Sequence, residues 1–457
     1  MSNAFTRRQL LQSTGVALFA TMALAACSST SSKDPHKITL WYAPDDPSVK
    51  AQKQWTQFNV TPFEKKNPGL TVNAVLVNGQ TFDQKQKVAL AAGTGPDIIT
   101  TAGSSTAIPY ATAGYLSDLG AASKANNWAS TILPWALDMG YVNGKLVSLP
   151  TSYESLVLYY NKTLFDKHGW KVPTDRDALV ELADEMKSAG VIPFAAGNAS
   201  YQGATEWLVS SYFNQVAGPG KLHAALSGSI PWTDSAFEAS IKMMKDDFDA
   251  GWYAGGVKQY FATQDPQKYA QFADGKSAMM VSGSWEMSTF PDYFGADGNK
   301  NEWAWASLPP LASGIPSGVF PLSVGGTISV NAHSSSKAAS TKYIEWMFSD
   351  TANMWGNALA TGAEPLPIPF QPSDVPSGID TRYAAQYQAI NEASEKGMVG
   401  YVTWTSLGAK SESYVLDHAD KVVNGNLTPA QFCQGLDQAF AADKKAGQLP
   451  TLFETKA

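Results

Sequence analysis

The stretch DQKQKVALAAGTGPDIIT, from Asp83 to Thr100, decides the fold class of this chain. Residues 83–92 predict a helix that ends at Gly93, because glycine readily adopts the backbone conformation that terminates a helix. Residues 97–100 follow as a short apolar run, which is typical of a buried parallel strand. A helix joined by a tight turn to such a strand is part of a β-α-β unit, so the stretch predicts an α/β fold.

The residues before this stretch complete the unit. Residues 38–43 and 70–77 predict strands, and residues 49–66 predict a helix that Asn67-Pro68-Gly69 ends. Ligand sites of parallel sheets lie beyond the carboxyl ends of the strands. We therefore expect polar and aromatic side chains in and after the three strands to converge on one cleft. These candidates are Trp41, Asp45, Gln80, Ser104 and Ser105.

The pattern after residue 100 predicts a second α/β unit. Residues 146–149 and 156–160 predict two strands, and residues 150–154 between them predict an interruption where the chain crosses between lobes. Further strands are expected at residues 191–194, 277–282, 303–307 and 324–330, with 303–307 beside 277–282. Helical patterns separate these runs and continue after Ser336.

The N-terminus has the pattern of an export signal. Arg7 and Arg8 precede an apolar run, too short to span a membrane, that ends in Leu24-Ala25-Ala26-Cys27. The run resembles a bacterial lipobox, so residues 1–26 are expected to be a signal peptide and Cys27 the lipidated residue. The serine-rich start of residues 27–36 is typical of a solvated tether. Twin-arginine and general secretory export both remain open, as does a structural role for Cys27 in a buried helix.

Composition narrows the class of ligand. The net charge of −7 argues against nucleic acid as a partner. Only Arg176 and Arg382 follow the export signal, so few guanidinium groups are present that could bind the carboxylate or phosphate of an anionic ligand. The 14 Trp and 18 Tyr residues offer flat rings that can stack on sugars, although most such rings belong to cores. The 5 histidines lack the spacing of metal ligands, so we expect neither a metal nor a cofactor.

Eight segments occur in an order that belongs to a known family. They are residues 91–99, 143–150, 158–162, 166–194, 272–280, 283–285, 325–326 and 365–367. Through them, nearly all of the chain after Cys27 resembles the family 1 extracellular solute-binding proteins of ABC importers, specifically the maltodextrin-binding-protein-like, carbohydrate type.

The resemblance implies a two-lobe periplasmic-binding-protein fold of type II, the Venus-flytrap arrangement, with the ligand cleft between discontinuous lobes. Residues 37–152 and 318–366 would form the N-terminal lobe, and residues 153–317 and 367–457 the C-terminal lobe. The implied function is that of a monomeric, lipid-anchored component that binds a neutral mono- or oligosaccharide by lobe closure. It would lie on the outer face of the cytoplasmic membrane or in the periplasm and deliver the sugar to membrane permease subunits, with no catalytic step.

The resemblance also implies functions for particular residues. Glu154, in Tyr153-Glu154-Ser155, matches an acceptor for sugar hydroxyls, and Trp285 matches an aromatic platform. Ser104 and Ser105 stand where the maltodextrin-binding protein has charged residues, which argues against maltodextrin as the ligand. The other positions that the resemblance assigns to the cleft are Tyr153, Trp207, Gly326 and Trp404.

Two alternatives remain open. A binding protein for a polyol, a phosphorylated polyol or a peptide would use the same fold, and Arg382 is the residue that could take an anionic ligand. An exported glycoside hydrolase would combine paired carboxylates with aromatic rings. The chain has no Gly-x-Ser-x-Gly and no His-Glu-x-x-His motif, which argues against hydrolase classes that depend on them.

Overall fold

The predicted helix, turn and strand of residues 83–100 are present in the computed structural model. Helix α3 (Phe82–Ala91) is followed by Gly93 with a φ of 68°, and then by β3 (Ile98–Thr101). The structure describes residues 34–43, 48–295 and 299–457. Asp45 and the export signal with Cys27 therefore lie outside the described residues, as does the side chain of Gln80.

A parallel three-stranded unit forms what we call the first lobe, together with the helices around it. Strand β1 (Lys37–Tyr42) lies between β2 (Thr71–Leu76) and β3. The predicted helix over residues 49–66 is two helices, α1 (Val49–Asn59) and α2 (Thr61–Lys66). The helix divides because Pro62 has no N–H to donate to the carbonyl of Phe58, which accepts instead from the Asn353 side chain at 2.8 Å.

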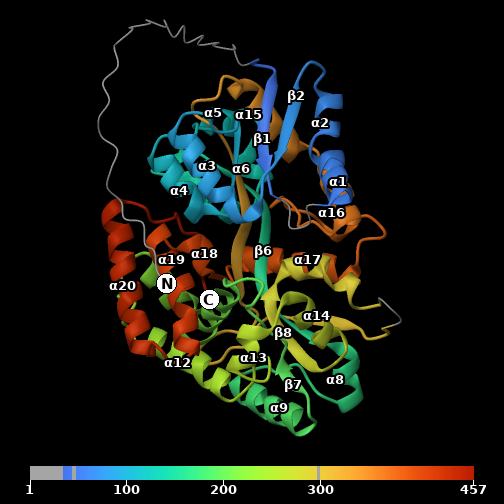
Figure 1. The fold of residues 1–457 in the computed structure, drawn as a ribbon, viewed down its shortest axis with the longest axis vertical. Helices are drawn as coiled ribbons and strands as arrows, with labels where there is room; N and C mark the ends of the chain where they lie inside the picture. The colour runs from blue at the N-terminus through green and yellow to red at the C-terminus, as the bar shows by residue number, and fades with distance from the viewer. Residues whose placement is uncertain (1–33, 44–47, 296–298) are drawn as a thin grey trace, which may run out of the picture. The chain divides into compact units, whose positions relative to one another are not determined.

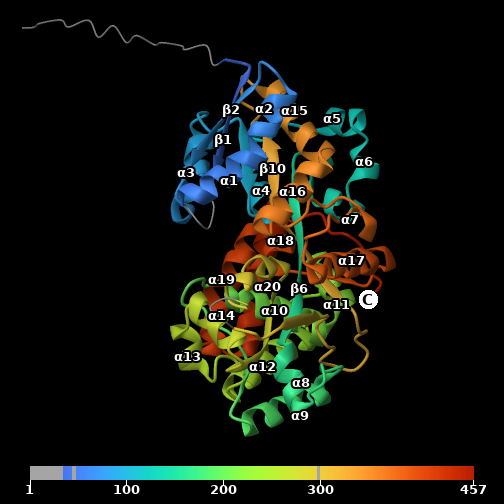
Figure 2. The same cartoon turned by 90° about the vertical axis from the view of Figure 1, so that its right-hand side faces the viewer.

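Two long antiparallel strands continue this sheet into what we call the second lobe, which contains β7, β8 and β9. They are β6 (Leu149–Asn161) and β10 (Phe320–Val330), and the strand order is β2-β1-β3-β10-β6-β8-β7. Figures 1 and 2 show β6 extending from the level of β1 toward β8 and β7.

The predicted interruption at residues 150–154 is wrong. Pro150 stands near the start of β6, opposite Thr327, and the strand continues through it. The proline and the polar side chains of residues 150–154 predict an interruption, but Ser152, Glu154 and Ser155 pair with β10, so the strand continues.

The remaining strands lie mainly in the second lobe. Strand β8 (Ser277–Gly283) lies between β6 and the parallel β7 (Ile192–Phe194). The pairing expected for residues 303–307 is also wrong, because β9 (Trp303–Ala306) pairs with β6 rather than β8. The short strands are β4 (Tyr141–Val142), β5 (Lys145–Leu146) and β11 (Val399–Tyr401).

Helices cover the sheet along its length (Figure 1). Beside β1–β3 and the adjoining parts of β6 and β10 are α4 (Ser104–Thr112), α5 (Gly120–Ala125), α6 (Trp128–Thr131), α7 (Pro134–Asp138), α15 (Lys337–Ser349) and α16 (Thr351–Thr361). The others are α8 (Lys162–His168), α9 (Arg176–Ser188), α10 (Ala204–Tyr212), α11 (Pro219–Leu226), α12 (Ser235–Asp249), α13 (Val257–Ala262), α14 (Asp265–Ala273), α17 (Thr381–Lys396), α18 (Thr403–Ser406), α19 (Ala409–Val423) and α20 (Pro429–Ala446). Among the described residues, none of the helices has both the length and the apolar character needed to cross a bilayer.

An irregularity in the pairing of β6 with β10 shapes the junction of the lobes. Ser323 pairs with Glu154 and Gly326 pairs with Ser152, so Val324 and Gly325 together stand opposite Tyr153 alone. This is a β-bulge, which bends a strand and redirects its residues. The bulge leaves Gly325 exposed beside Ser152 and Glu154.

Asp97 is expected to stabilise the first lobe. Its carboxylate accepts the backbone N–H of Thr39 at 2.8 Å and the hydroxyl of Ser334 at 2.6 Å, and the residue is 5% exposed. The Asp97→Ala variant leaves both donors without that acceptor, so we expect the free energy of unfolding to fall by about 2–4 kcal/mol. Urea denaturation measures this change. As a control, Asp184→Ala on the exposed face of α9 should change it by less than about 0.5 kcal/mol, and an equal loss in both variants would contradict the assignment.

Candidate functional site

Glu154 lies in the middle of β6, where the two lobes meet. It is 7% exposed, and its Oε1 accepts the Ser323 hydroxyl at 2.8 Å and the Trp404 indole N–H at 3.2 Å. Burial raises the pKa of this carboxyl above its usual range. Glu154 is therefore a shielded acceptor that is held in place by one residue of β10 and one of α18.

A second carboxyl, which the sequence reasoning missed, lies beside Glu154. Oε1 of Glu364 accepts the hydroxyls of Ser284 at 3.0 Å and Tyr387 at 3.2 Å. Burial and the charge of Glu154 raise the pKa of Glu364 well above the usual value. Its position directly before the motif of residues 365–367 is the only sequence signal that could have pointed to it.

Three tryptophans from separate elements form a row next to Glu154. Trp207 is on α10, Trp285 is in the 3-10 helix η3 (Ser284–Ser288), and Trp404 is on α18. The ring centroids of Trp207 and Trp285 are 5.0 Å apart, and those of Trp285 and Trp404 are 6.3 Å apart. All three rings are partly exposed, so this tryptophan row presents apolar faces beside a carboxyl acceptor.

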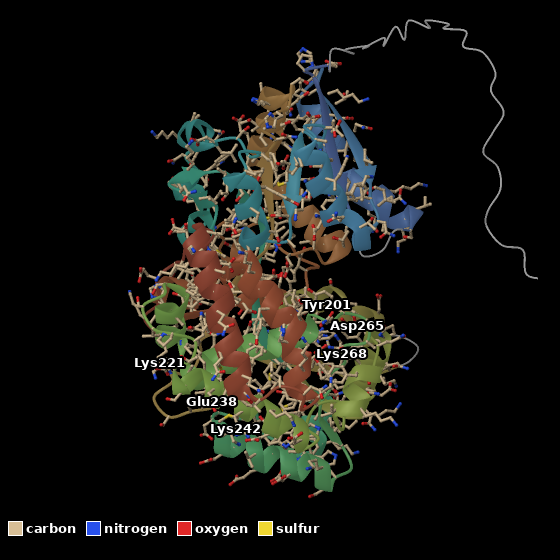
Figure 3. The ribbon with its side chains drawn as sticks, turned by 60° about the vertical axis from the view of Figure 1, so that its left-hand side comes forward. Tyr201, Lys221, Glu238, Lys242, Asp265 and Lys268 are labelled. Atoms are coloured by element: carbon tan, nitrogen blue, oxygen red, sulfur yellow. The ribbon has the colours of Figure 1, made fainter. Side chains whose placement is uncertain are left out.

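Further acidic groups surround the row. Glu206 is 2% exposed and accepts the Thr403 hydroxyl at 2.7 Å, and burial together with the charge of Glu412 raises its pKa to about 8. Burial and the charge of Asp83 help to raise the pKa of Glu412 to about 7. The ring centroid of Tyr201 lies 5.5 Å from that of Trp207, with the rings tilted by 32°, and Figure 3 shows Tyr201 at the edge of the second lobe nearest the first.

The structure brings together four of the predicted site residues, which are Glu154, Trp207, Trp285 and Trp404. Gly326 adjoins them in the bulge of β10, where a side chain would meet the Thr151 hydroxyl. Trp41 is partly exposed on β1, with the ammonium group of Lys85 4.8 Å from its ring centroid.

Three other predicted residues make only internal contacts. The Ser104 hydroxyl donates to the carbonyl of Met139 at 3.0 Å and the Ser105 hydroxyl to that of Leu407 at 2.5 Å, and both serines are buried. Tyr153 is fully buried, and its ring packs against those of Trp135 and Tyr387. These residues join elements of the fold, and their burial could not be read from the chain.

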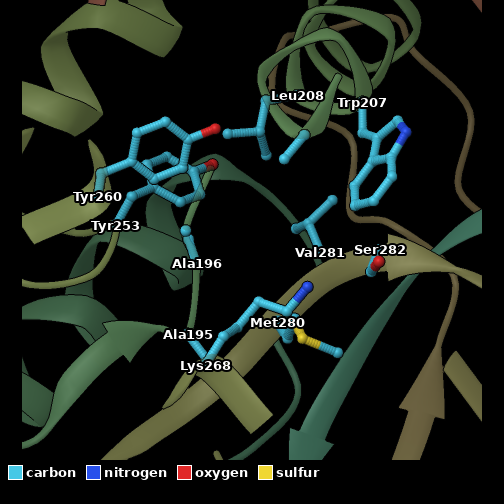
Figure 4. A pocket seen from close by; sticks show the side chains of 12 residues that line it. Ala195, Ala196, Trp207, Leu208, Tyr253, Tyr260, Lys268, Met280, Val281 and Ser282 are labelled. Atoms are coloured by element: carbon cyan, nitrogen blue, oxygen red, sulfur yellow. The ribbon is translucent and has the colours of Figure 1, made fainter. Parts of the chain in front are cut away.

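One of two hollows near the junction of the lobes is lined by a tryptophan of the row. A small cavity of about 320 Å³ lies beneath Trp207 and is lined by Lys268, Tyr253 and Tyr260, as Figure 4 shows. A groove of about 1890 Å³ lies between α1 and α16 of the first lobe and residues 287–292 of the second. None of Glu154, Glu364 and the three tryptophans of the row lines this groove. The described residues contain no cluster of His, Cys, Asp and Glu that could hold a metal ion.

Comparison with known proteins identifies the family. The chain is 31% identical over 174 residues to a probable sugar-binding periplasmic protein of Mesorhizobium japonicum, which covers 36% of this chain and 42% of that one. It is 25% identical over 288 residues to a multiple sugar-binding protein of Streptococcus mutans, which covers 60% and 64%. The matches thus span less than two thirds of these relatives.

A solved structure shows the fold. A chitin oligosaccharide binding protein superposes with a TM-score of 0.75 at 22% identity, over 90% of this chain and 98% of that one. The expected two-lobe α/β fold is confirmed. The profile of the bacterial extracellular solute-binding proteins matches residues 46–354. The chain therefore belongs to the family of bacterial extracellular solute-binding proteins.

Proposed function

We propose that this protein binds a neutral mono- or oligosaccharide outside the cytoplasmic membrane and delivers it to the permease subunits of an ABC importer. The observation that carries the proposal is the tryptophan row beside Glu154. Aromatic faces take the apolar C–H face of a sugar ring, and a shielded carboxyl takes its hydroxyls. Family membership supports a binding protein rather than an enzyme.

Lobe closure would complete such a site. We propose lobes of residues 37–152 with 318–366 and of residues 153–317 with 367–457, which makes Glu154 and Glu364 neighbours from different lobes. A sugar that contacts both lobes only in the closed state shifts the equilibrium toward closure by its difference in affinity for the two states. Changing a 1:99 population to 99:1 takes about 5.5 kcal/mol.

The alternatives have weaker support. The guanidinium of Arg382 is held by Asp380 at 2.6 Å and lies 3.9 Å from the ring centroid of Trp303, so its donors are not directed to a phosphorylated polyol. Arg176 is likewise paired with Asp247. The two carboxyls at the site, Glu154 and Glu364, are hydrogen-bonded to one another, whereas glycosidases hold theirs about 5 Å or more apart to admit the substrate.

Export and anchoring complete the proposal. The lipobox-like end of the signal segment supports cleavage before Cys27 and attachment of a lipid to its thiol. The protein would then be tethered to the outer face of the cytoplasmic membrane and act as a monomer beside its permease.

Replacing Trp285 by alanine is expected to weaken sugar binding. Loss of the central ring of the row should reduce affinity at least tenfold, about 1.4 kcal/mol, with little change in the unfolding temperature because the ring is only partly buried. Calorimetric titration with maltotriose, xylobiose, laminaribiose and chitobiose measures the affinity. Tyr141→Ala, a partly exposed aromatic on β4, is the control and should bind like the wild type. Hydrolysis of chromogenic glycosides would contradict the binding function.

Replacing Cys27 by serine is expected to release the protein from the membrane. The variant cannot form the thioether to lipid, so it should appear in the soluble fraction and incorporate no labelled palmitate in its bacterial host. Cys433→Ser, which changes a buried thiol on α20, is the control and should remain membrane-bound. Equal membrane association of the Cys27→Ser variant and the wild type would contradict the anchor.

A further inference from the structure

The carboxyls of Glu154 and Glu364 use their oxygens in the same way. Oε1 of each accepts two hydrogen bonds from the protein, from Ser323 and Trp404 in one case and from Ser284 and Tyr387 in the other. Both Oε2 atoms face the bulge at Gly325. A Cβ placed on that glycine would lie 2.8 Å from Oε2 of Glu154 and 2.9 Å from Oε2 of Glu364.

Gly325 keeps the approach to these two oxygens open. The glycine is exposed, and any side chain at this position would also come within 2.4 Å of the Ser152 hydroxyl. The bulge of β10 therefore places two carboxyl oxygens and one hydroxyl against an exposed glycine, where a side chain would cover them. The Ser152 hydroxyl is already hydrogen-bonded to Glu364, so the carboxyl oxygens are the acceptors that a sugar hydroxyl can use.

The surroundings of the pair contain neutral donors. Apart from their bond to each other, the two carboxyls are hydrogen-bonded among the described residues by hydroxyls and one indole, and no Lys or Arg there forms an ion pair with them. The other titratable groups that face the pair are tyrosines, and they are Tyr153, Tyr159, Tyr201, Tyr383 and Tyr387. In the described part of the chain, no positive charge compensates two ionised carboxylates at this place.

Two adjacent shielded carboxyls without a cation cannot both ionise at low cost, so one retains its proton at neutral pH. The hydrogen bond between Glu154 and Glu364 requires such a proton. The pair then carries a single negative charge, and its two Oε2 atoms stay together at Gly325. In the doubly ionised state, repulsion would drive Glu364 and its loop away from β6.

We infer that Glu364 is a second ligand-contacting carboxyl, which shares one proton with Glu154 so that their two Oε2 atoms together bind a hydroxyl of a neutral saccharide at Gly325. The inference rests on the proposed function and adds a residue that determines specificity.

Variants of Glu364 test the contact. With the tightest binder among maltotriose, xylobiose, laminaribiose and chitobiose, Glu364→Ala should lose at least tenfold in affinity at pH 6.5. Glu364→Gln should stay within about threefold of the wild type, because its amide donates to Glu154 as the shared proton does. Glu392→Ala and Glu392→Gln, at an exposed position on α17, match the charge changes and should bind like the wild type. Equal affinity of Glu364→Ala and Glu392→Ala would overturn the inference.

The pH dependence of sugar affinity distinguishes a shared proton on Glu364 from a purely structural role of this residue. Wild-type affinity should be constant at acid pH and should fall as the pair loses its proton on the way to pH 9, whereas Glu364→Gln should show no such fall. Affinity that rises with pH would show that the doubly ionised pair, or a cationic ligand, is the binding form, and it would overturn the inference. So would identical profiles of the wild type and Glu364→Gln.

The unfolding temperature of the protein without sugar, measured against pH, tests the shared proton independently of sugar binding. The raised pKa of Glu364 means that the folded state holds the proton more tightly than the unfolded state. The contribution of this proton to the free energy of unfolding is complete below about pH 4, the ordinary range of a carboxyl pKa. It is lost as the pH rises toward the raised pKa of Glu364. The unfolding temperature of the wild type should therefore fall more between pH 5 and 8 than that of Glu364→Gln, and an equal fall would overturn the shared proton. Failure of all four sugars to bind would count against the proposed function and, with it, the sugar contact.

Discussion

The antiparallel pairing of β6 with β10 is the constraint on which the arrangement of the cleft depends. Both strands run from one lobe into the other, so their register decides which residues meet at the junction. Ser323 stands opposite Glu154 and holds its carboxyl, and the bulge beside this pair turns Gly325 toward the same carboxyl. A shift of one residue would turn Glu154 into the core and Tyr153 out of it, so the hydrophobic pattern also fixes the site.

Local sequence signals predicted much of the fold, and they failed where long-range pairing decides the outcome. The helix, turn and strand of residues 83–100 follow from glycine and a buried apolar run, and they are present. Pro150 predicted a break, but a proline near the start of a strand does not interrupt it when the following residues are paired, here first with β10 and then with β8 and β9. Residues 303–307 form a strand whose partner cannot be read from its own pattern.

The candidate site was only partly accessible to sequence reasoning. Glu154, Trp285 and Trp404 were named from the resemblance, and the structure places them together. Glu364 was missed because its importance depends on contacts with Ser284 and Tyr387, which lie far from it in the sequence. Ser104 and Ser105 were named because they follow a strand, but helix α4 buries their hydroxyls against backbone carbonyls. Position after a strand does not reveal which way a side chain is turned.

The bulge in β10 also has a mechanical consequence. Regular pairing of β10 with β6 is lost only between Ser323 and Thr327, so the proposed lobe closure would bend the two-stranded connection most easily there. If the lobes rotate about this point, residues at their outer edges move much farther than residues close to the bulge. A solute group beside Gly325 would make its contacts early in closure. The outer edges of the lobes would move the farthest and would contact the rest of the solute last.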